Sequence, residues 1–310
     1  MRITQNMMSQ QFLYNLTNLN TTMLNQENQI STGKTLNLPS DNPLGVSQDM
    51  QTSALLSQSN VYTSTISQGL SWMQNTNSVM QEVSQSLQSI QTDVMQALNS
   101  PNQSQAGLQA MSSSVKEYAQ QVFTLLNTQQ GDQYLFGGTS GNIAPVTTIT
   151  GGVGYTLTSA TGLSSSIQYQ VAQGVEININ VSAYSILGAT LSGGSSSTAT
   201  LQSTLQQVSQ DIASGTSSNL SNDLQNLNAA MGNVTNQTAD LGARMQRMTS
   251  LQTQMSQYTA TLTNEKGVIE DANMAQVITQ YNTDQISYQA ALKMGSQILL
   301  PTLVSYLPNG

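Results

Sequence analysis

Residues 55–97 read LLSQSNVYTSTISQGLSWMQNTNSVMQEVSQSLQSIQTDVMQA, and this stretch decides the fold. Its apolar residues recur in alternating steps of four and three, the 3.5-residue period that lines one seam of a coiled-coil helix. The pattern lasts about six heptads, or roughly 65 Å of helix. The seam positions, a few of which are polar or small, are Leu55, Ser59, Tyr62, Ile66, Gly69, Met73, Thr76, Met80, Val83, Leu87, Ile90, Val94 and Ala97.

Cap-like pairs flank this long helix on both sides. Asn42 followed by Pro43 is typical of an N-cap and a first helical position, since proline lacks only a donor that is unpaired there anyway. Ser100 and Pro101 repeat the pair and predict a corner into another helix, whose seam covers residues 108–125.

The same heptad spacing appears near both termini and in the C-terminal half. These segments are residues 12–30, 201–212, 220–262 and 274–299. Because helices of similar length lie on either side of the middle of the chain, we expect the halves to pair as an antiparallel coiled-coil rod. In that arrangement the termini meet at one end, and the middle of the chain lies at the far tip.

The middle of the chain has a different pattern. Residues 167–171 and 175–181 alternate apolar and polar side chains with period two, which predicts strands with one buried face. The Gly/Ser run at 192–197 is typical of a flexible connector. The predicted fold is mainly α, with a small central β-rich insert domain. The expected domains are a terminal helical core (1–40 and 270–310), a coiled-coil rod (41–136 and 200–269) and an outward-facing β-rich domain (137–199).

Composition excludes several classes of function. The 310 residues include 7 Lys+Arg and 15 Asp+Glu, and neither His nor Cys, so the usual zinc and haem ligands and His-based triads are missing. A net charge of −8, without Lys or Arg between Lys116 and Arg244, argues against nucleic-acid binding. We expect the acids of that interval, including Asp211 and Asp223, to be solvated. The apolar runs are too short for membrane insertion, and residues 1–5 lack a Sec-type apolar segment.

Enzymatic alternatives find little support. Gly33-Lys34-Thr35 is similar to the tail of a phosphate-binding loop, but Asn28 stands where the leading glycine belongs. A Ser/Asp hydrolase in the β insert would lack a base with a pKa near neutrality. Glu270 and Asp271 fit a helix N-terminus, where acids oppose the dipole. A disordered secreted effector is also disfavoured, because the heptad pattern continues over many helical turns. We therefore predict no enzyme, no catalytic residue, no cofactor and no metal.

The two terminal segments carry apolar residues on more than one face. Leu13 and Leu24 lie off the first seam, and Ile286 lies off the last, so each helix needs more than one neighbour. That pattern favours packing among copies of the chain. The predicted subunit-interface residues are Phe12, Leu16, Leu19, Met23, Ile30, Met274, Ile278, Tyr281, Tyr288, Leu292 and Leu299.

Several short motifs resemble those of the bacterial flagellin superfamily, in the same order along the chain. Residues 29–37 (QISTGKTLN) resemble its N-terminal signature, and residues 241–245 and 270–275 resemble its C-terminal helices. Residues 39–43 (PSDNP) and 131–138 (GDQYLFGG) are more similar to the hook–filament junction branch than to filament flagellins. The motif residues are Ser31, Gly33, Lys34, Pro39, Asp41, Pro43, Tyr134, Leu135, Phe136, Gly137 and Gly138, while Asn42 and Asn273 replace acids that the superfamily usually has.

This resemblance implies a structural role outside the cell. Members of the junction branch are exported from the cell through the flagellar type III channel, without a cleaved signal. They form a layer between the hook and the filament. The implied partners are other copies of the chain, the first hook-associated protein, flagellin and an export chaperone. The alternative is a flagellin, which uses the same architecture as the bulk filament subunit.

Overall fold

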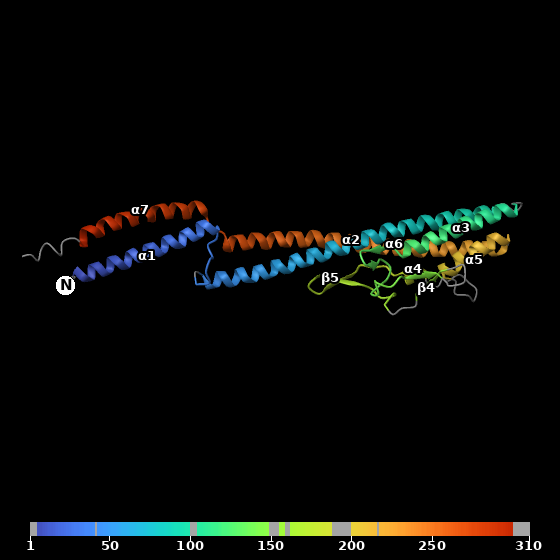
Figure 1. Cartoon of the computed structure of the whole chain (residues 1–310), viewed down its shortest axis with the longest axis horizontal. Helices are drawn as coiled ribbons and strands as arrows, with labels where there is room; N and C mark the ends of the chain where they lie inside the picture. The colour runs from blue at the N-terminus through green and yellow to red at the C-terminus, as the bar shows by residue number, and fades with distance from the viewer. Residues whose placement is uncertain are drawn as a thin grey trace, which may run out of the picture. The chain divides into compact units, whose positions relative to one another are not determined.

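The computed structural model describes residues 5–40, 42–99, 104–148, 155–158, 162–187, 200–215 and 217–299 (Figure 1). The helices are α1 (Gln5–Thr32), α2 (Pro43–Asn99), α3 (Gln105–Leu126), α4 (Ala183–Leu187), α5 (Leu201–Ser214), α6 (Ser217–Glu270) and α7 (Met274–Leu299). The strands are β1 (Gln129–Gln130), β2 (Gln133–Tyr134), β3 (Val146–Thr148), β4 (Tyr155–Leu157), β5 (Gln168–Ala172) and β6 (Val175–Asn178). The prediction of a mainly helical fold with a small β-rich insert is confirmed.

The chain divides into two compact units. The first unit consists of residues 1–58 and 258–310, and the second consists of residues 59–257. In the first unit α1 lies beside α7 (Figure 1).

Among the described residues, none of the helices has both the length and the apolar character needed to cross a membrane.

Local chemistry explains where the helices begin and end. Asn42 caps α2, because its Oδ1 accepts a hydrogen bond of 3.1 Å from the Gly45 amide. Gly33 ends α1 with a φ of 74°, which a residue with a side chain rarely adopts. The predicted start of α3 at Pro101 is wrong, since α3 begins at Gln105 behind the N-cap Ser104. The predicted cap pair Ser100 and Pro101 lies outside the described residues.

The second unit contains a bundle of α2, α3, α5 and α6. The predicted α2 seam is buried from Ile66 to Val94, and Leu227, Val234 and Leu241 of α6 are buried as well. Hydrogen bonds between polar flanks join the helices: Gln91 to Asn228 (2.6 Å), Ser114 to Asp93 (2.8 Å) and Ser112 to the Ser209 carbonyl (2.6 Å). The bundle therefore combines an apolar seam with neutral polar contacts along its edges.

The described residues of the insert form three antiparallel two-stranded pairs, β1–β2, β3–β4 and β5–β6. The two strands predicted from period-two alternation form β5 and β6, in which Tyr169 pairs with Ile177. The buried face includes Val171, Ile177 and Ile179. The predicted Gly/Ser connector at 192–197 lies outside the described residues.

The insert packs along the sides of α2 and α6 rather than at the tip, which corrects the predicted placement. A Cβ atom on Gly69 of α2 would come within 3.2 Å of both Tyr169 and Ile179. From α6, the Asn233 side chain donates to the Ser185 carbonyl (2.8 Å), and Arg244 donates to the Asn180 carbonyl (3.3 Å). Gly69 was predicted as an ordinary seam position, but its missing side chain makes room for the insert.

Candidate assembly surfaces

The α1 seam predicted from heptads packs against α7 of the same chain. Its residues Phe12, Leu16, Leu19, Met23 and Ile30 are half-buried. The Phe12 ring lies over Gly295 of α7, where an added Cβ would come within 2.5 Å of it. The buried Gln26 donates from Nε2 to Asp284 Oδ2 at 2.7 Å and fixes the register of the two helices. The seam is thus occupied within one chain.

On α7 the inward face is shifted by one residue at some heptads. Met274, Tyr281 and Tyr288 face inward as expected, but Val277 is buried, whereas the neighbouring Ile278 is exposed. Leu292 is also exposed, while Ala291 is half-buried. The Leu299 side chain lies outside the described residues.

The shift has a physical reason. Asp284 occupies an inward position because Gln26 supplies its hydrogen-bond donor, and small residues at Ala291 and Gly295 leave room for the large side chains of α1. A heptad count that looks for large apolar residues assigns these positions to their neighbours instead.

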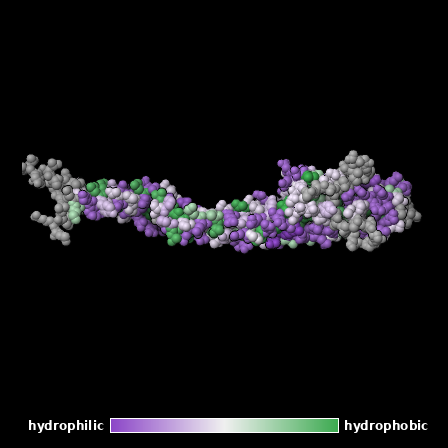
Figure 2. Space-filling view, turned by 90° about the horizontal axis from the view of Figure 1, so that it is seen from below, coloured by the Kyte–Doolittle hydropathy of each residue, from purple (hydrophilic) through white to green (hydrophobic). Residues whose placement is uncertain are grey.

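Apolar side chains remain exposed on both helices after they have paired. We call them the outer residues: Met7, Met8, Leu13, Tyr14 and Leu24 on α1, and Ile278, Ile286, Leu292 and Met294 on α7. The space-filling view shows apolar residues interrupting the hydrophilic surface of the helices (Figure 2). These exposed apolar residues make the outer sides of α1 and α7 the candidate surface for contact with another protein.

A corner of main-chain hydrogen bonds joins the end of α1 to the α6–α7 turn. The Thr35 amide donates to the Glu270 carbonyl (2.7 Å), and the Ala272 amide donates to the Gly33 carbonyl (2.9 Å). Asn273 caps α7 by accepting from the Gln276 amide (3.3 Å). Glu270 is the last residue of α6, so its predicted place at a helix N-terminus is wrong.

Charged side chains reinforce this corner. Lys34 forms an ion pair with Glu270, which is nearly buried, and Lys266 lies 3.5 Å from Glu270 and 3.8 Å from Asp49. The hydrogen bond from Lys34 lowers the pKa of Glu270, and Lys266 adds a smaller favourable charge. Lys34 is therefore held in an ion pair at a helix corner, which accounts for the Gly33-Lys34-Thr35 motif without a phosphate.

We predict that Glu270→Gln will loosen this corner. The amide keeps the shape of the side chain but loses the two ion pairs, which together cost about 1 kcal/mol when partly solvated. Amide hydrogen exchange of Thr35 and Ala272 should accelerate by about fivefold. Glu265→Gln on the exposed side of α6 serves as the control and should change neither amide; equal acceleration in both variants would contradict the role given to the corner.

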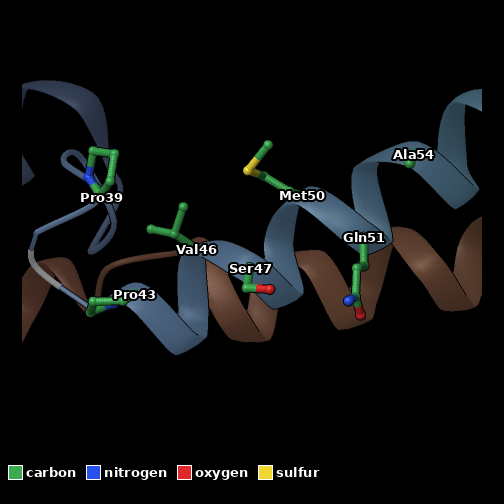
Figure 3. Close-up of a pocket in the computed structure, with 7 residues that line it drawn as sticks. All are labelled: Pro39, Pro43, Val46, Ser47, Met50, Gln51 and Ala54. Carbon is green, nitrogen blue, oxygen red and sulfur yellow. The ribbon is translucent and has the colours of Figure 1, made fainter.

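Beside the corner, a groove of about 450 Å³ lies between the linker and the first turns of α2 (Figure 3). Its walls carry no charge and comprise Pro39, Pro43, Val46, Ser47, Met50, Gln51 and Ala54. Met50 is 67% exposed, and the neighbouring Leu38 and Leu44 are exposed as well. Pro39 and Pro43 of the linker motif thus shape an apolar surface, whereas Asp41 lies outside the described residues.

The second motif of the junction type anchors the insert. Tyr134 pairs with Gln129 in the β1–β2 hairpin, and the following Leu135 and Phe136 are buried. The Phe136 carbonyl accepts a hydrogen bond from the Ala183 amide at 3.0 Å, which ties the motif to α4. Leu135 and Phe136 thus contribute to the packing of the insert. The described residues contain no group of three His, Cys, Asp or Glu side chains that would hold a metal ion.

Comparisons with known proteins agree with this architecture. The model of the bacterial flagellin N-terminal helical region matches residues 3–140, and the model of the C-terminal helical region matches residues 224–307. Together these models cover more than two thirds of the chain. Flagellar hook-associated protein 3 of Escherichia coli K12 is 28% identical over 146 residues, which are 47% of this chain and 46% of that protein. The match therefore spans about half the length of this relative.

Solved structures show the same fold. A putative flagellar hook-associated protein from Vibrio parahaemolyticus aligns with a TM-score of 0.65 at 19% identity, covering 74% of this chain and 99% of that one. Flagellar hook-associated protein 3 from Legionella pneumophila aligns with a TM-score of 0.62 at 11% identity, covering 70% and 97%. At these identities the likeness concerns the fold alone.

Proposed function

Because the chain belongs to the bacterial flagellin superfamily, we propose that it is a structural component of the flagellum that assembles side by side with copies of itself. The observation that carries this proposal is the set of outer residues. They stay exposed after α1 and α7 have packed against each other, so the paired helices still need apolar neighbours. The faces on α1 and α7 differ, and contacts between unlike faces propagate from copy to copy into a ring or helical layer.

Within the flagellum, we place the chain at the junction between hook and filament. The likeness to hook-associated protein 3 and the motifs at 39–43 and 131–138 favour this place over the bulk filament. The partners are then the first hook-associated protein on the hook side and flagellin on the filament side. An export chaperone and the flagellar type III channel would deliver the chain to this extracellular site. The role is structural and requires no catalysis.

Immunogold labelling of intact flagella with an antibody against the purified chain tests this place. We expect label at one discrete position between hook and filament. The sheared flagella should contain this chain as a minor band beside a much stronger flagellin band on a gel. Label along the whole filament, together with a dominant band of this chain, would overturn the junction role and favour the flagellin alternative.

A further inference from the structure

Two acidic side chains meet inside the second unit, at the corner between α5 and α6. Asp223 of α6 is 4% exposed and faces inward, so the prediction that it is solvated is wrong. Asp211 lies in the last turn of α5, where its Oδ1 is 3.4 Å from Nδ2 of Asn219, one helical turn before Asp223 on the same face of α6. A hydrogen bond between two carboxyl groups requires that one of them carries a proton, because an ionised carboxylate only accepts.

The surroundings leave the pair short of donors. Oδ2 of Asp211 and Oδ2 of Asp223 are both buried without a hydrogen-bond donor from the described residues. Asp211 Oδ1 receives a long contact of 3.4 Å from the Asn219 side chain. Asp211 also lies near the C-terminal end of its helix, where the dipole disfavours a negative charge.

No positive side chain in the described part of the bundle compensates for the pair. The charged residues that α2 and α3 contribute to this unit are Glu82 and Asp93 on α2 and Lys116 and Glu117 on α3, and none of them forms an ion pair with either acid. Asp93 accepts a hydrogen bond from Ser114 instead. Among the described residues, Asp211 is the charged group that acts on Asp223.

We propose that Asp211 and Asp223 form a proton latch, in which one shared proton holds the end of α5 against the start of α6. With the proton in place, the pair is a neutral acid bonded to a carboxylate and tolerates burial. Without it, two negative charges face each other in a buried site, and the corner separates to let water reach them. The latch makes this end of the bundle tight in acid and loose in mild alkali.

Burial and the neighbouring Asp211 raise the pKa of Asp223 from an ordinary value of 3.8 to about 7. The closed corner therefore binds more protons than the open corner between about pH 4 and pH 7. Closing is favoured at the acidic end of that window, and the advantage is lost as the pH rises through 7. With an ordinary pKa in the open state, the opening equilibrium should increase roughly 50- to 100-fold between pH 5 and pH 8.

The absence of cysteine in the sequence makes this opening measurable. Ser209 is buried in the same turn of α5, two residues before Asp211, and Ser209→Cys is nearly isosteric, so its reaction with 4,4′-dithiodipyridine reports exposure of the end of α5. An exposed reference thiol, Ala229→Cys, corrects for the pH dependence of the reagent. The corrected labelling rate of Ser209→Cys should rise roughly 50- to 100-fold from pH 5 to pH 8.

Two comparisons decide whether the latch is the cause. In the Asp223→Asn background the rise should be less than about threefold, because the amide donates to Asp211 at every pH. Asp211→Asn should behave in the same way and keeps the test intact if the first variant fails to fold. A rise that persists in both variants overturns the proposal.

A second buried serine separates a local opening from global unfolding. Ser86 of α2 is buried in the same unit, and the labelling of Ser86→Cys should stay nearly constant over this pH range. A parallel rise at Ser86→Cys would mean that the whole unit unfolds and would overturn a local latch. Suppression of the opening at pH 8 by millimolar CaCl2 would overturn it as well, since the pair would then be a cation site.

Discussion

Leu292→Asp will leave the isolated chain folded and will exclude it from assembled flagella. Leu292 is 47% exposed on α7, so a charge there meets water in the monomer and costs little. If α7 packs against a neighbouring copy, the same charge becomes buried without a partner, at a cost of about 3 kcal/mol per contact, or roughly a hundredfold in affinity. In the proposed layer each copy would contact neighbours on both sides, so the loss would multiply.

Leu16→Asp should fail in a different way. Leu16 is half-buried in the seam between α1 and α7, so its replacement unpairs the helices before any assembly takes place. Far-ultraviolet circular dichroism of the purified monomer should show a loss of helix for Leu16→Asp and none for Leu292→Asp. Both variants should be missing from sheared flagella when each is the sole copy in the cell.

Gln280→Asp supplies the matched control, because it adds the same charge at an exposed polar position of α7. It should enter flagella at a level within about twofold of the original chain. Normal incorporation of Leu292→Asp would show that the exposed part of α7 is not a contact surface. The proposed assembly would then have to rest on α1 or on the linker groove alone.

The helices could be predicted from the sequence because their apolar residues follow a single period over many turns. The α2 seam from Ile66 to Val94 is buried as the heptads indicate. The heptad count could not predict which of two adjacent apolar residues faces inward. Val277 and Ile278 are both β-branched and apolar, and Val277 is the one that faces inward in a helix pair whose register includes the Gln26–Asp284 hydrogen bond and the contact of Phe12 with Gly295.

The burial of the acid pair and the position of the insert could not be predicted from the sequence, for a related reason. Asp223 precedes Leu224, and a count that favours large apolar residues places Leu224 in the seam and the acid in water. Only the approach of Asp211 from another helix makes burial of the acid tolerable. The one available hint for the insert was Gly69, a small residue in a seam of large ones, which marks a close approach by another part of the chain.

Gly138→Ala is expected to be the most damaging single-methyl substitution in the insert. Gly138 has a φ of 56°, a backbone conformation that costs an alanine about 1 kcal/mol or more. In addition, its Cβ would come within 2.2 Å of the Gly162 carbonyl oxygen and 2.9 Å of the Leu163 carbonyl oxygen. Both obstacles are backbone atoms, so no side-chain rotation relieves the contact, and the two segments have to separate.

The separation also removes contacts that hold the insert together. The Thr139 amide donates to the Gly162 carbonyl at 3.0 Å, immediately beside the substituted residue. Strain and lost packing together should cost about 3 kcal/mol, which lowers the unfolding midpoint of a unit of this size by roughly 10 °C. Trp72, the single tryptophan, is buried in α2 one turn after Gly69, where the insert packs, and its fluorescence should report the change.

Gly131→Ala distinguishes crowding from backbone conformation alone. Gly131 has a similar φ of 63°, but nothing lies within 4 Å of the position that a Cβ would take. It should therefore cost about 1 kcal/mol, a third of the effect at Gly138. Equal midpoints for the two variants would mean that Gly138 is needed for its backbone conformation alone. A larger loss at Gly138 would assign the last glycine of the GDQYLFGG motif to the close approach of residues 162–163, a role that a larger residue cannot fill while the insert stays closed.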